Sequence, residues 1–424
     1  MGLLYQVVKP VAGYVLRRFY RNIDITGLEH IPRKGAVILA ANHPTAFIEP
    51  CLLACFQPRQ LHFLARGDLY KNKLATFALR TLNILPVYRI QDGGFGKLRN
   101  NFETFDDCFR VLGDGKAIMI LAEGSCVHEK KLRPLRKGTA RIALGALEAD
   151  PTLSEVHIVP VGVNFTAPDR LRSTVMIRCG EPIKASKWLQ DYLSNPTPAL
   201  TNLTRHLRQR LSPLVVQHPS DVAVPAAELA LEIIRTQVPE LTGLSHDGRQ
   251  LAAELETAKR SLPTELLNKL AAQLRHHGVS MDAVAGAKQG ASNNRQLNRP
   301  GNHWHKLGFF WVLQIPLLPI HWIADYIATN KVNHVEFHQP VRFAATAIGL
   351  VVLIPLFLII LPPIGKAWTI VAILTWKFYQ RMYDREQGHH EQKRVHRLVK
   401  ADQKKLRDVY QEVLRELDFP QSVE

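Results

Sequence analysis

The sequence predicts an α/β protein: a mixed β-sheet flanked by helices, followed by a helical insert and C-terminal transmembrane helices. Three observations lead to this fold class. Between residues 23 and 185, apolar runs of strand length alternate with helical stretches. Residues 186–302 are polar, helical in pattern and interrupted by prolines. The longest apolar runs all lie after Leu307, which indicates a membrane region there.

The predicted sheet rests on six apolar segments within residues 23–185. Val37–Ala41 and Ala117–Ala122 are continuous apolar runs, which are typical of strands covered on both faces. We expect four further strands, at His62–Arg66, Leu85–Arg89, Val156–Val163 and Thr174–Cys179. The intervening patterns predict helices at Phe102–Leu112 and Pro134–Leu147. Strands that alternate with helices in this way predict one sheet with helices on both of its faces.

The N-terminal residues 1–22 carry apolar side chains at helical spacing, with basic residues between them. Lys9, Pro10, Arg17 and Arg18 interrupt any apolar core, so a secretory signal is not expected. One interpretation is a basic amphipathic helix that lies on a membrane surface. An ordinary helix that faces a protein core has the same pattern, and both alternatives stay open.

The last part of the chain divides into a membrane region, residues 303–380, and a basic cytoplasmic helix, residues 381–424. Phe309–Ala328 is apolar but contains polar residues and prolines, so it could span a bilayer or lie in its interface. Phe343–Leu361 has no charge over nineteen residues, enough to cross a hydrocarbon core of about 30 Å. With Ile364–Tyr379 it predicts a helical hairpin. Basic residues at both ends place these ends in the cytoplasm.

The charge balance favours an anionic partner. Lys and Arg number 54 against 37 Asp and Glu, a formal net charge of +17. Nucleic acid is disfavoured because the sequence has no zinc-finger spacing, aromatic RNA-binding strand or basic heptads. An anionic membrane agrees better with the apolar runs. The five cysteines suggest neither a disulfide framework nor a zinc site, so we expect reduced thiols and no metal.

Three segments contain residues suited to catalysis or phosphate binding. In the first, Asn42-His43-Pro44, a histidine directly follows a predicted strand, and Glu49 is the first carboxylate after it. A carboxylate that holds one imidazole nitrogen leaves the other nitrogen as a base for a hydroxyl group. His43 and Glu49 are therefore a candidate catalytic pair, with Asn42 as a candidate substrate contact.

The other two segments are candidates for phosphate binding. Arg89 ends the predicted strand at Leu85, and an arginine can donate two hydrogen bonds to one phosphate. Glu123-Gly124-Ser125 follows the apolar strand at Ala117–Ala122 and precedes a basic stretch that includes Arg136 and Lys137. Clustered cations before a helix attract phosphate. Solvated surface charges would give the same pattern.

In this order, the three segments resemble the glycerolipid acyltransferase family, known for an H-x-x-x-x-D motif, a strand ending in Arg, an E-G-[TS] motif and a later Val-Pro motif. His43, Arg89, Glu123-Gly124-Ser125 and Val159-Pro160 fill these places. The resemblance covers about residues 25–185. The chain departs from the pattern at one point, because Ile48 stands where the family has Asp and the acid, Glu49, comes one residue later.

The resemblance implies a mechanism in which His43 deprotonates an acceptor hydroxyl that attacks an acyl thioester, while Glu49 orients His43. Arg89 and the segment Glu123-Gly124-Ser125, with Arg136 and Lys137, would hold the phosphate of the acceptor. No metal, cofactor or covalent enzyme intermediate is required. The implied activity belongs to phospholipid biosynthesis, on the cytoplasmic face of a membrane.

The implied donor is acyl-CoA or acyl carrier protein, and the implied acceptor is glycerol 3-phosphate or 1-acylglycerol 3-phosphate. Two alternatives stay open: an acyltransferase that remodels another lysolipid, and a membrane-anchored lipid-binding protein whose catalytic pair has decayed. A transporter is disfavoured because the apolar spans are few and follow an α/β domain.

Overall fold

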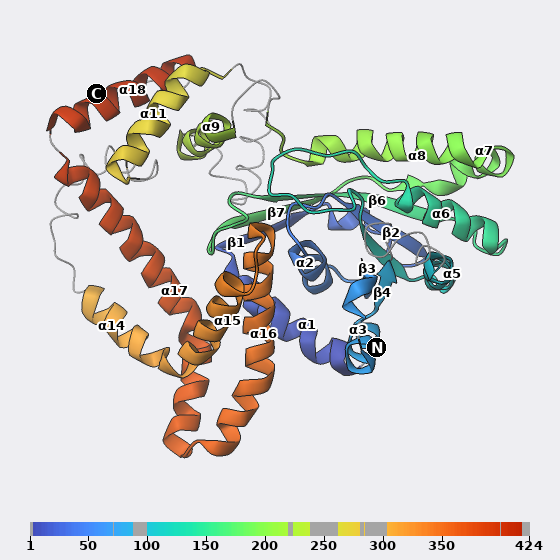
Figure 1. The fold of residues 1–424 in the computed structure, drawn as a ribbon, viewed down its shortest axis with the longest axis horizontal. Coiled ribbons are helices and arrows are strands. Elements are labelled where there is room, and N and C mark those ends of the chain that lie inside the picture. The colour runs from blue at the N-terminus through green and yellow to red at the C-terminus, as the bar shows by residue number, and fades with distance from the viewer. Residues whose placement is uncertain are drawn as a thin grey trace. The chain divides into compact units, whose positions relative to one another are not determined.

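The computed structural model describes residues 3–70, 72–87, 100–218, 224–237, 262–279, 284, 303–398 and 400–417. The chain folds into two compact units. Residues 1–215 and 320–354 make the first unit, and residues 216–319 and 355–424 make the second. The first unit contains the β-sheet (Figure 1).

The strands of the sheet are β1 (Asn22–Thr26), β2 (Ala36–Ala41), β3 (Leu61–Arg66), β4 (Ile84–Val87), β5 (Ala117–Leu121), β6 (Val156–Phe165), β7 (Thr174–Cys179) and β8 (Ile183–Lys184). In the described part of the unit they follow the order β1-β7-β6-β2-β5-β3-β4, with β8 paired to β6. Neighbouring strands are parallel, except that β6 runs antiparallel to β7 and β8. The expected mixed sheet is confirmed.

The central strand β2 has six buried residues, because apolar cores lie on both faces of the sheet. Alternate side chains of a strand point to opposite faces. Val37, Leu39 and Ala41 accordingly belong to one core, whereas Ala36, Ile38 and Ala40 belong to the other. This double burial explains why the strand is a continuous apolar run in the sequence.

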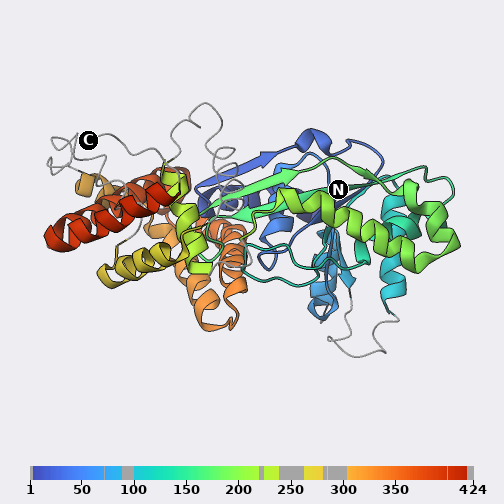
Figure 2. The ribbon, with the colours of Figure 1, turned by 90° about the horizontal axis from the view of Figure 1, so that it is seen from above.

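Helices cover both faces of the sheet, as expected (Figures 1 and 2). On one face lie α1 (Leu3–Phe19), α2 (Ile48–Phe56) and the first part of α16 (Val335–Ile360). On the other lie α5 (Asn100–Gly113), α6 (Gly138–Ala149) and α8 (Pro196–Leu211). Shorter helices of this unit are η1 (Leu28–His30), η2 (Gly67–Leu69), α3 (Lys73–Thr81), η4 (Ala185–Trp188), α7 (Leu189–Ser194) and η5 (Ser212–Leu214).

The N-terminal helix α1 turns its apolar face to the protein core. Val15 and Leu16 are fully buried, and Phe19 packs edge to face against Phe343 of α16 with ring centroids 5.8 Å apart. The core-facing alternative therefore describes this helix. The apolar side chains in its carboxyl-terminal half are covered by protein, whereas Val7 nearer its start is 45% exposed.

Two predicted boundaries differ from the structure. The helix expected from Pro134 begins at Gly138, because the backbone before it is held in another conformation: the N–H of Arg136 donates to the carbonyl of Ala122 at 2.8 Å. The expected domain boundary at residue 185 lies inside the first unit, which continues to Val215. The reason is α8, whose apolar face packs on the sheet.

The second unit is helical in its described part. Its helices are α9 (Val224–Gln237), α11 (Thr264–His277), α14 (His303–Leu313), η8 (Ile315–Leu317), α17 (Pro363–Arg397) and α18 (Lys400–Glu416). The helical pattern expected within residues 186–302 is confirmed for α9 and α11. The single charged helix expected after Arg381 is instead the end of α17 followed by α18.

The helix α16 is the one described helix that is long and apolar enough to cross a membrane, with a mean hydropathy of 2.8. Its carboxyl-terminal part is exposed, including Val352, Leu356 and Ile359. The preceding helix α15 (Leu318–Asn330) is tied to it by an ion pair between Asp325 and Arg342. One described helix is thus a candidate membrane span, and the several C-terminal transmembrane helices expected from the sequence are not confirmed.

Candidate active site

The candidate site begins where β2 ends. Asn42 continues the pairing of β2 with β6 through its side chain: its amide donates to the carbonyl of Val163 at 2.9 Å and accepts from the N–H of Val163 at 2.7 Å. These two bonds account for the buried position of Asn42 and fix the direction in which the chain leaves the sheet. The next residue, His43, is therefore presented at the carboxyl-terminal edge of the sheet.

His43 and Glu49 lie side by side. Nδ1 of His43 is 3.8 Å from Oε1 of Glu49, an ion-pair separation that is longer than a hydrogen bond. Glu49 is completely buried, and the side chain of His43 is 8% exposed. A carboxylate beside an imidazole can balance the charge of a protonated ring.

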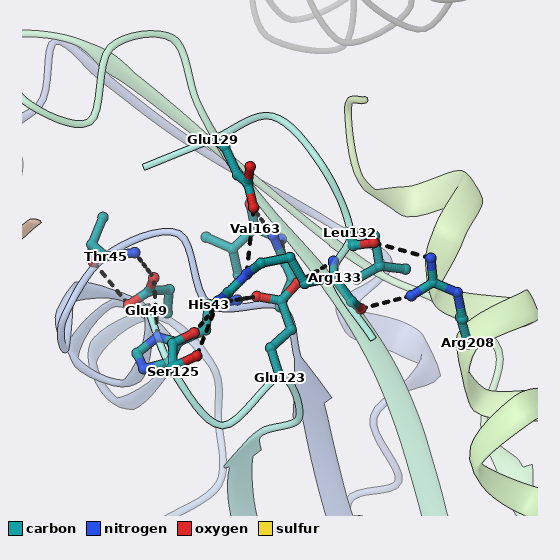
Figure 3. A network of polar contacts seen from close by, with 11 residues as sticks. His43, Thr45, Glu49, Glu123, Ser125, Glu129, Leu132, Arg133, Val163 and Arg208 are labelled. Carbon is teal, nitrogen blue, oxygen red and sulfur yellow. Dashed lines mark hydrogen bonds and ion pairs between the residues drawn. The ribbon is translucent and has the colours of Figure 1, made fainter. Parts of the chain in front are cut away.

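The carboxylate of Glu49 is fixed by Thr45 (Figure 3). The backbone N–H of Thr45 donates to Oε1 at 2.5 Å, and its hydroxyl donates to Oε2 at 2.9 Å. The same hydroxyl accepts from the N–H of Ile48 at 3.3 Å. This arrangement ties the loop that carries His43 to the first turn of α2.

The position of the acid one residue later than in the family pattern has a structural reason. Helix α2 begins at Ile48, and the side chain of Ile48 is fully buried in the apolar core beneath the sheet. Successive residues of a helix are turned by about 100°. The side chain of Glu49 therefore faces His43, whereas an acid at position 48 would lie in the core.

A second loop reaches the site from β5, which is parallel to β2 and pairs Leu121 with Ala41. Because the carboxyl ends of parallel strands meet at one edge of a sheet, the loops after β2 and β5 are neighbours. Glu123, only 5% exposed, accepts a hydrogen bond of 3.1 Å from the backbone N–H of His43. The backbone of His43 is thus hydrogen-bonded to one carboxylate, and its ring lies beside another.

Arg133 connects Glu123 to Ser125 (Figure 3). Its backbone N–H donates to Oε1 of Glu123 and its Nη2 to Oε2, each at 2.9 Å. Its Nη1 donates to the hydroxyl of Ser125 at 3.0 Å, and Nη2 also reaches the carbonyl of Ser125. The guanidinium of Arg133, 19% exposed, therefore lies in the loop that holds the backbone of His43.

Sequence reasoning did not single out Arg133 among the basic residues after Ser125. The available signal was its place before the helix, but the helix was expected to start at Pro134. Arg136 and Lys137, which were selected instead, are exposed. Arg136 does lie against Gly124, where a Cβ would come within 3.1 Å of its Cγ. Gly124 has φ +76°, a conformation that glycine adopts without strain.

Arg89 lies outside the described residues, because the described part of β4 ends at Val87. Its predicted contact with phosphate stays a prediction. Among the residues that the structure describes, no group of three or more His, Cys, Asp or Glu side chains could hold a metal ion.

Two further ionisable groups lie near the acids of the site. Burial lowers the pKa of His128, and the negative charges of Glu336, Asp169 and Glu49 offset part of this decrease. Burial raises the pKa of the Cys126 thiol, and the charge of Glu49 adds to this rise. Both groups are therefore uncharged near neutral pH.

Taken together, the fold and the site define an α/β domain that presents a histidine–carboxylate pair at the carboxyl edge of its sheet. Residues 22–164 match the family model described as Acyltransferase. These residues form an acyltransferase-family domain, and the resemblance read from the motifs is confirmed.

Three known proteins are similar to parts of the chain. Glycerol-3-phosphate O-acyltransferase 2 of Saccharomyces cerevisiae is 28% identical over 144 residues, which are 33% of this chain and 19% of that protein. Glycerol-3-phosphate O-acyltransferase 1 of the same yeast is 35% identical over 88 residues, 21% of this chain and 12% of that protein. The chain thus matches less than a fifth of either yeast protein.

The third is a crystal structure, that of the 1-acyl-sn-glycerophosphate acyltransferase PlsC from Thermotoga maritima. It is 18% identical in sequence, with a TM-score of 0.33. The similarity covers 48% of this chain and 80% of that one.

Proposed function

We propose that this protein is an O-acyltransferase that moves a fatty acyl group from a thioester to a hydroxyl group of glycerol 3-phosphate or 1-acylglycerol 3-phosphate. The observation that carries the proposal is the pairing of His43 with the buried carboxylate of Glu49, on a loop whose backbone is held by Glu123. The acyltransferase domain and the glycerol-3-phosphate O-acyltransferase activity that names the yeast relatives support the reaction class.

In the proposed reaction, Nε2 of His43 accepts the proton of the acceptor hydroxyl while the oxygen attacks the thioester carbonyl. The tetrahedral intermediate collapses, the C–S bond breaks, and the thiolate takes the proton back from the imidazolium. An ester and a free thiol result. Glu49 orients the ring of His43 and balances its positive charge, as the acid of a catalytic triad does.

The phosphate of the acceptor requires a cation, and we assign this part to Arg133 with help from Arg136 and Lys137. A guanidinium can donate two hydrogen bonds to a phosphate and stays charged at all working pH values. Glu123, by contrast, is an anion that would repel phosphate. Its three bonds to His43 and Arg133 suit a residue that positions the other groups.

We further propose that the protein acts at a membrane, where 1-acylglycerol 3-phosphate and the acylated products reside. The mean hydropathy of α16 supports insertion. On α3, Leu74 and Phe77 are 78% and 68% exposed beside the basic residues Lys73 and Arg80. An apolar face edged by cations suits the headgroup region of an anionic bilayer.

The apolar first half of α17 remains a candidate second arm of a hairpin with α16. A single crossing would place the basic segment after Tyr379 on the far side of the membrane, against the positive-inside rule. A hairpin returns this segment to the cytoplasmic side. We therefore propose that the catalytic domain and the C-terminal helices share the cytoplasmic face.

The experiment that tests the proposed function is mass spectrometry of the lipids made by the purified protein. The protein is given glycerol 3-phosphate, lysophosphatidate and other lysolipids, each with acyl-CoA and with acyl carrier protein as the donor. Acyl transfer to one of the two phosphate-bearing acceptors supports the proposal. Transfer only to another lysolipid favours the remodelling activity, and lipid binding without transfer favours a decayed site.

A further inference from the structure

Arg208 lies on α8, outside the residues that match the family model, yet it contacts the site loop directly (Figure 3). Its Nη1 donates to the carbonyl of Arg133 at 2.6 Å, and its Nη2 donates to the carbonyl of Leu132 at 3.0 Å. One planar guanidinium therefore binds two consecutive carbonyl groups. Lysine could not reproduce this arrangement, because its single ammonium lacks the rigid fork.

The same segment is also held by apolar contacts. Leu132 is 1% exposed and packs against Leu211 at the end of α8, Leu214 in η5 and Val215 directly after it. Hydrogen bonds from Arg208 and packing of Leu132 thus act on one short stretch of backbone. The sequence separation is 75 residues, so these contacts depend on the tertiary fold.

The peptide unit between Leu132 and Arg133 is bound on both sides. Its C=O accepts from Arg208, and its N–H donates to Oε1 of Glu123 at 2.9 Å. In a trans peptide these two groups point in opposite directions. The peptide unit therefore transmits the position of α8 to Glu123, which in turn accepts from the N–H of His43.

We infer that Arg208 is a positioning residue for the acyl-transfer site, acting through Leu132 and Arg133. This inference rests on the proposed function, in which the side chain of Arg133 binds the acceptor phosphate. Arg208 orients the backbone of Arg133 and so sets the direction of its guanidinium. Its removal leaves the catalytic pair His43–Glu49 chemically complete.

The test is a double-mutant cycle in the full chain, with Arg208→Ala, Arg133→Ala and both together. Arg208→Ala is expected to raise the KM for the acceptor about tenfold with little change in the KM for the donor, the size of one lost hydrogen-bonded contact. In the Arg133→Ala background it should have almost no further effect on acceptor KM. Arg208→Lys should rescue only partly.

The control is Arg205→Ala on the same helix, because the hydrogen bond of Arg205 goes to Asn202 within α8. The inference would be overturned if the acceptor KM of the double variant rose by the product of the two single effects. It would also be overturned if Arg208→Ala changed the acceptor KM no more than the control does. If Arg208→Ala does not fold, the same double-mutant cycle is measured with Arg208→Gln and Arg208→Lys.

A readout independent of activity separates this inference from the proposed function. Hydrogen exchange in the stretch from Glu123 to Arg136 should be faster in Arg208→Ala than in Arg205→Ala, since the N–H of Arg133 loses its opposing support. Unchanged exchange would contradict the positioning role. Absence of transfer by the unaltered protein, with faster exchange in the variant, would instead reject the proposed function alone.

Discussion

The backbone N–H of His43 donates a hydrogen bond of 3.1 Å to Oε2 of Glu123, 80 positions later in the sequence. This bond exists because β2 and β5 are parallel neighbours, so the loops that follow them meet at one edge of the sheet. The two acids therefore have different roles. Glu49 faces the ring of His43, whereas Glu123 holds the backbone of His43 and the guanidinium of Arg133.

The first prediction concerns Glu49. Glu49→Gln keeps the shape of the side chain and removes its charge, so the imidazolium of His43 loses its counter-ion. Turnover should fall by at least about a hundredfold, since the corresponding amide replacement in a serine protease costs about 10⁴-fold. Steady-state kinetics measure this. Glu181→Gln, at a side chain 63% exposed, is the control and should be neutral.

A companion variant tests the one-residue shift of the acid. Ile48→Asp in the Glu49→Gln background should not restore turnover, because the side chain at position 48 points into the apolar core. A buried unpaired carboxylate should instead lower the thermal unfolding temperature. Restored turnover would show that the site accepts an acid at the usual family position.

The second prediction assigns phosphate binding. Arg133→Ala should raise the acceptor KM at least about tenfold, and Arg133→Lys should recover only part of this loss, because lysine cannot donate two parallel hydrogen bonds. Arg110→Ala, at an arginine side chain 71% exposed, serves as control. An unchanged acceptor KM in Arg133→Ala would mean that other cations bind the phosphate, and Arg89 would be the first candidate.

The third prediction concerns Cys126, whose thiol pKa is raised by burial. A raised pKa lowers the fraction of reactive thiolate at pH 7, so Cys126 should not act as a nucleophile. Cys126→Ser should retain turnover within about twofold. Mass spectrometry of protein incubated with donor alone should find no acyl group on the cysteine. An acyl adduct at Cys126 would point to a covalent intermediate.

The fourth prediction concerns topology. Reporters placed near Gly301 and after Tyr379 should lie on the cytoplasmic side, and one placed between Leu361 and Pro362 should lie on the opposite side. The reason is the excess of Lys and Arg on both flanks of the apolar stretch. Opposite locations for the first two reporters would mean an odd number of membrane spans between them.

The strands at the centre of the sheet could be predicted because their burial on both faces leaves a continuous apolar run. The edge strand β1 was not predicted. Three of the five residues in its sequence, Asn-Ile-Asp-Ile-Thr, are polar, and the strand is only partly buried. The orientation of α1 could not be decided either, since a protein core and a bilayer select the same apolar stripe.

The candidate site was predictable where sequence neighbours form it. His43 and Glu49 are six positions apart, and the structure brings them together. The contacts of Arg133 and Arg208 depend on the packing of loops and of α8, for which the sequence contains no local pattern. A run of basic residues in a sequence shows that cations are present. It does not show which of their side chains points into the site.

The most direct test of the account is the turnover of His43→Ala. A general base contributes about 10²- to 10⁴-fold to such reactions, and the substitution should leave folding intact. His62→Ala, at a partly buried histidine of β3, controls for the loss of an imidazole. With purified protein, acyl-CoA and 1-acylglycerol 3-phosphate, His43→Ala is expected to lose at least about a thousandfold in turnover at an unchanged unfolding temperature. Turnover within a few-fold of the unaltered protein would contradict it.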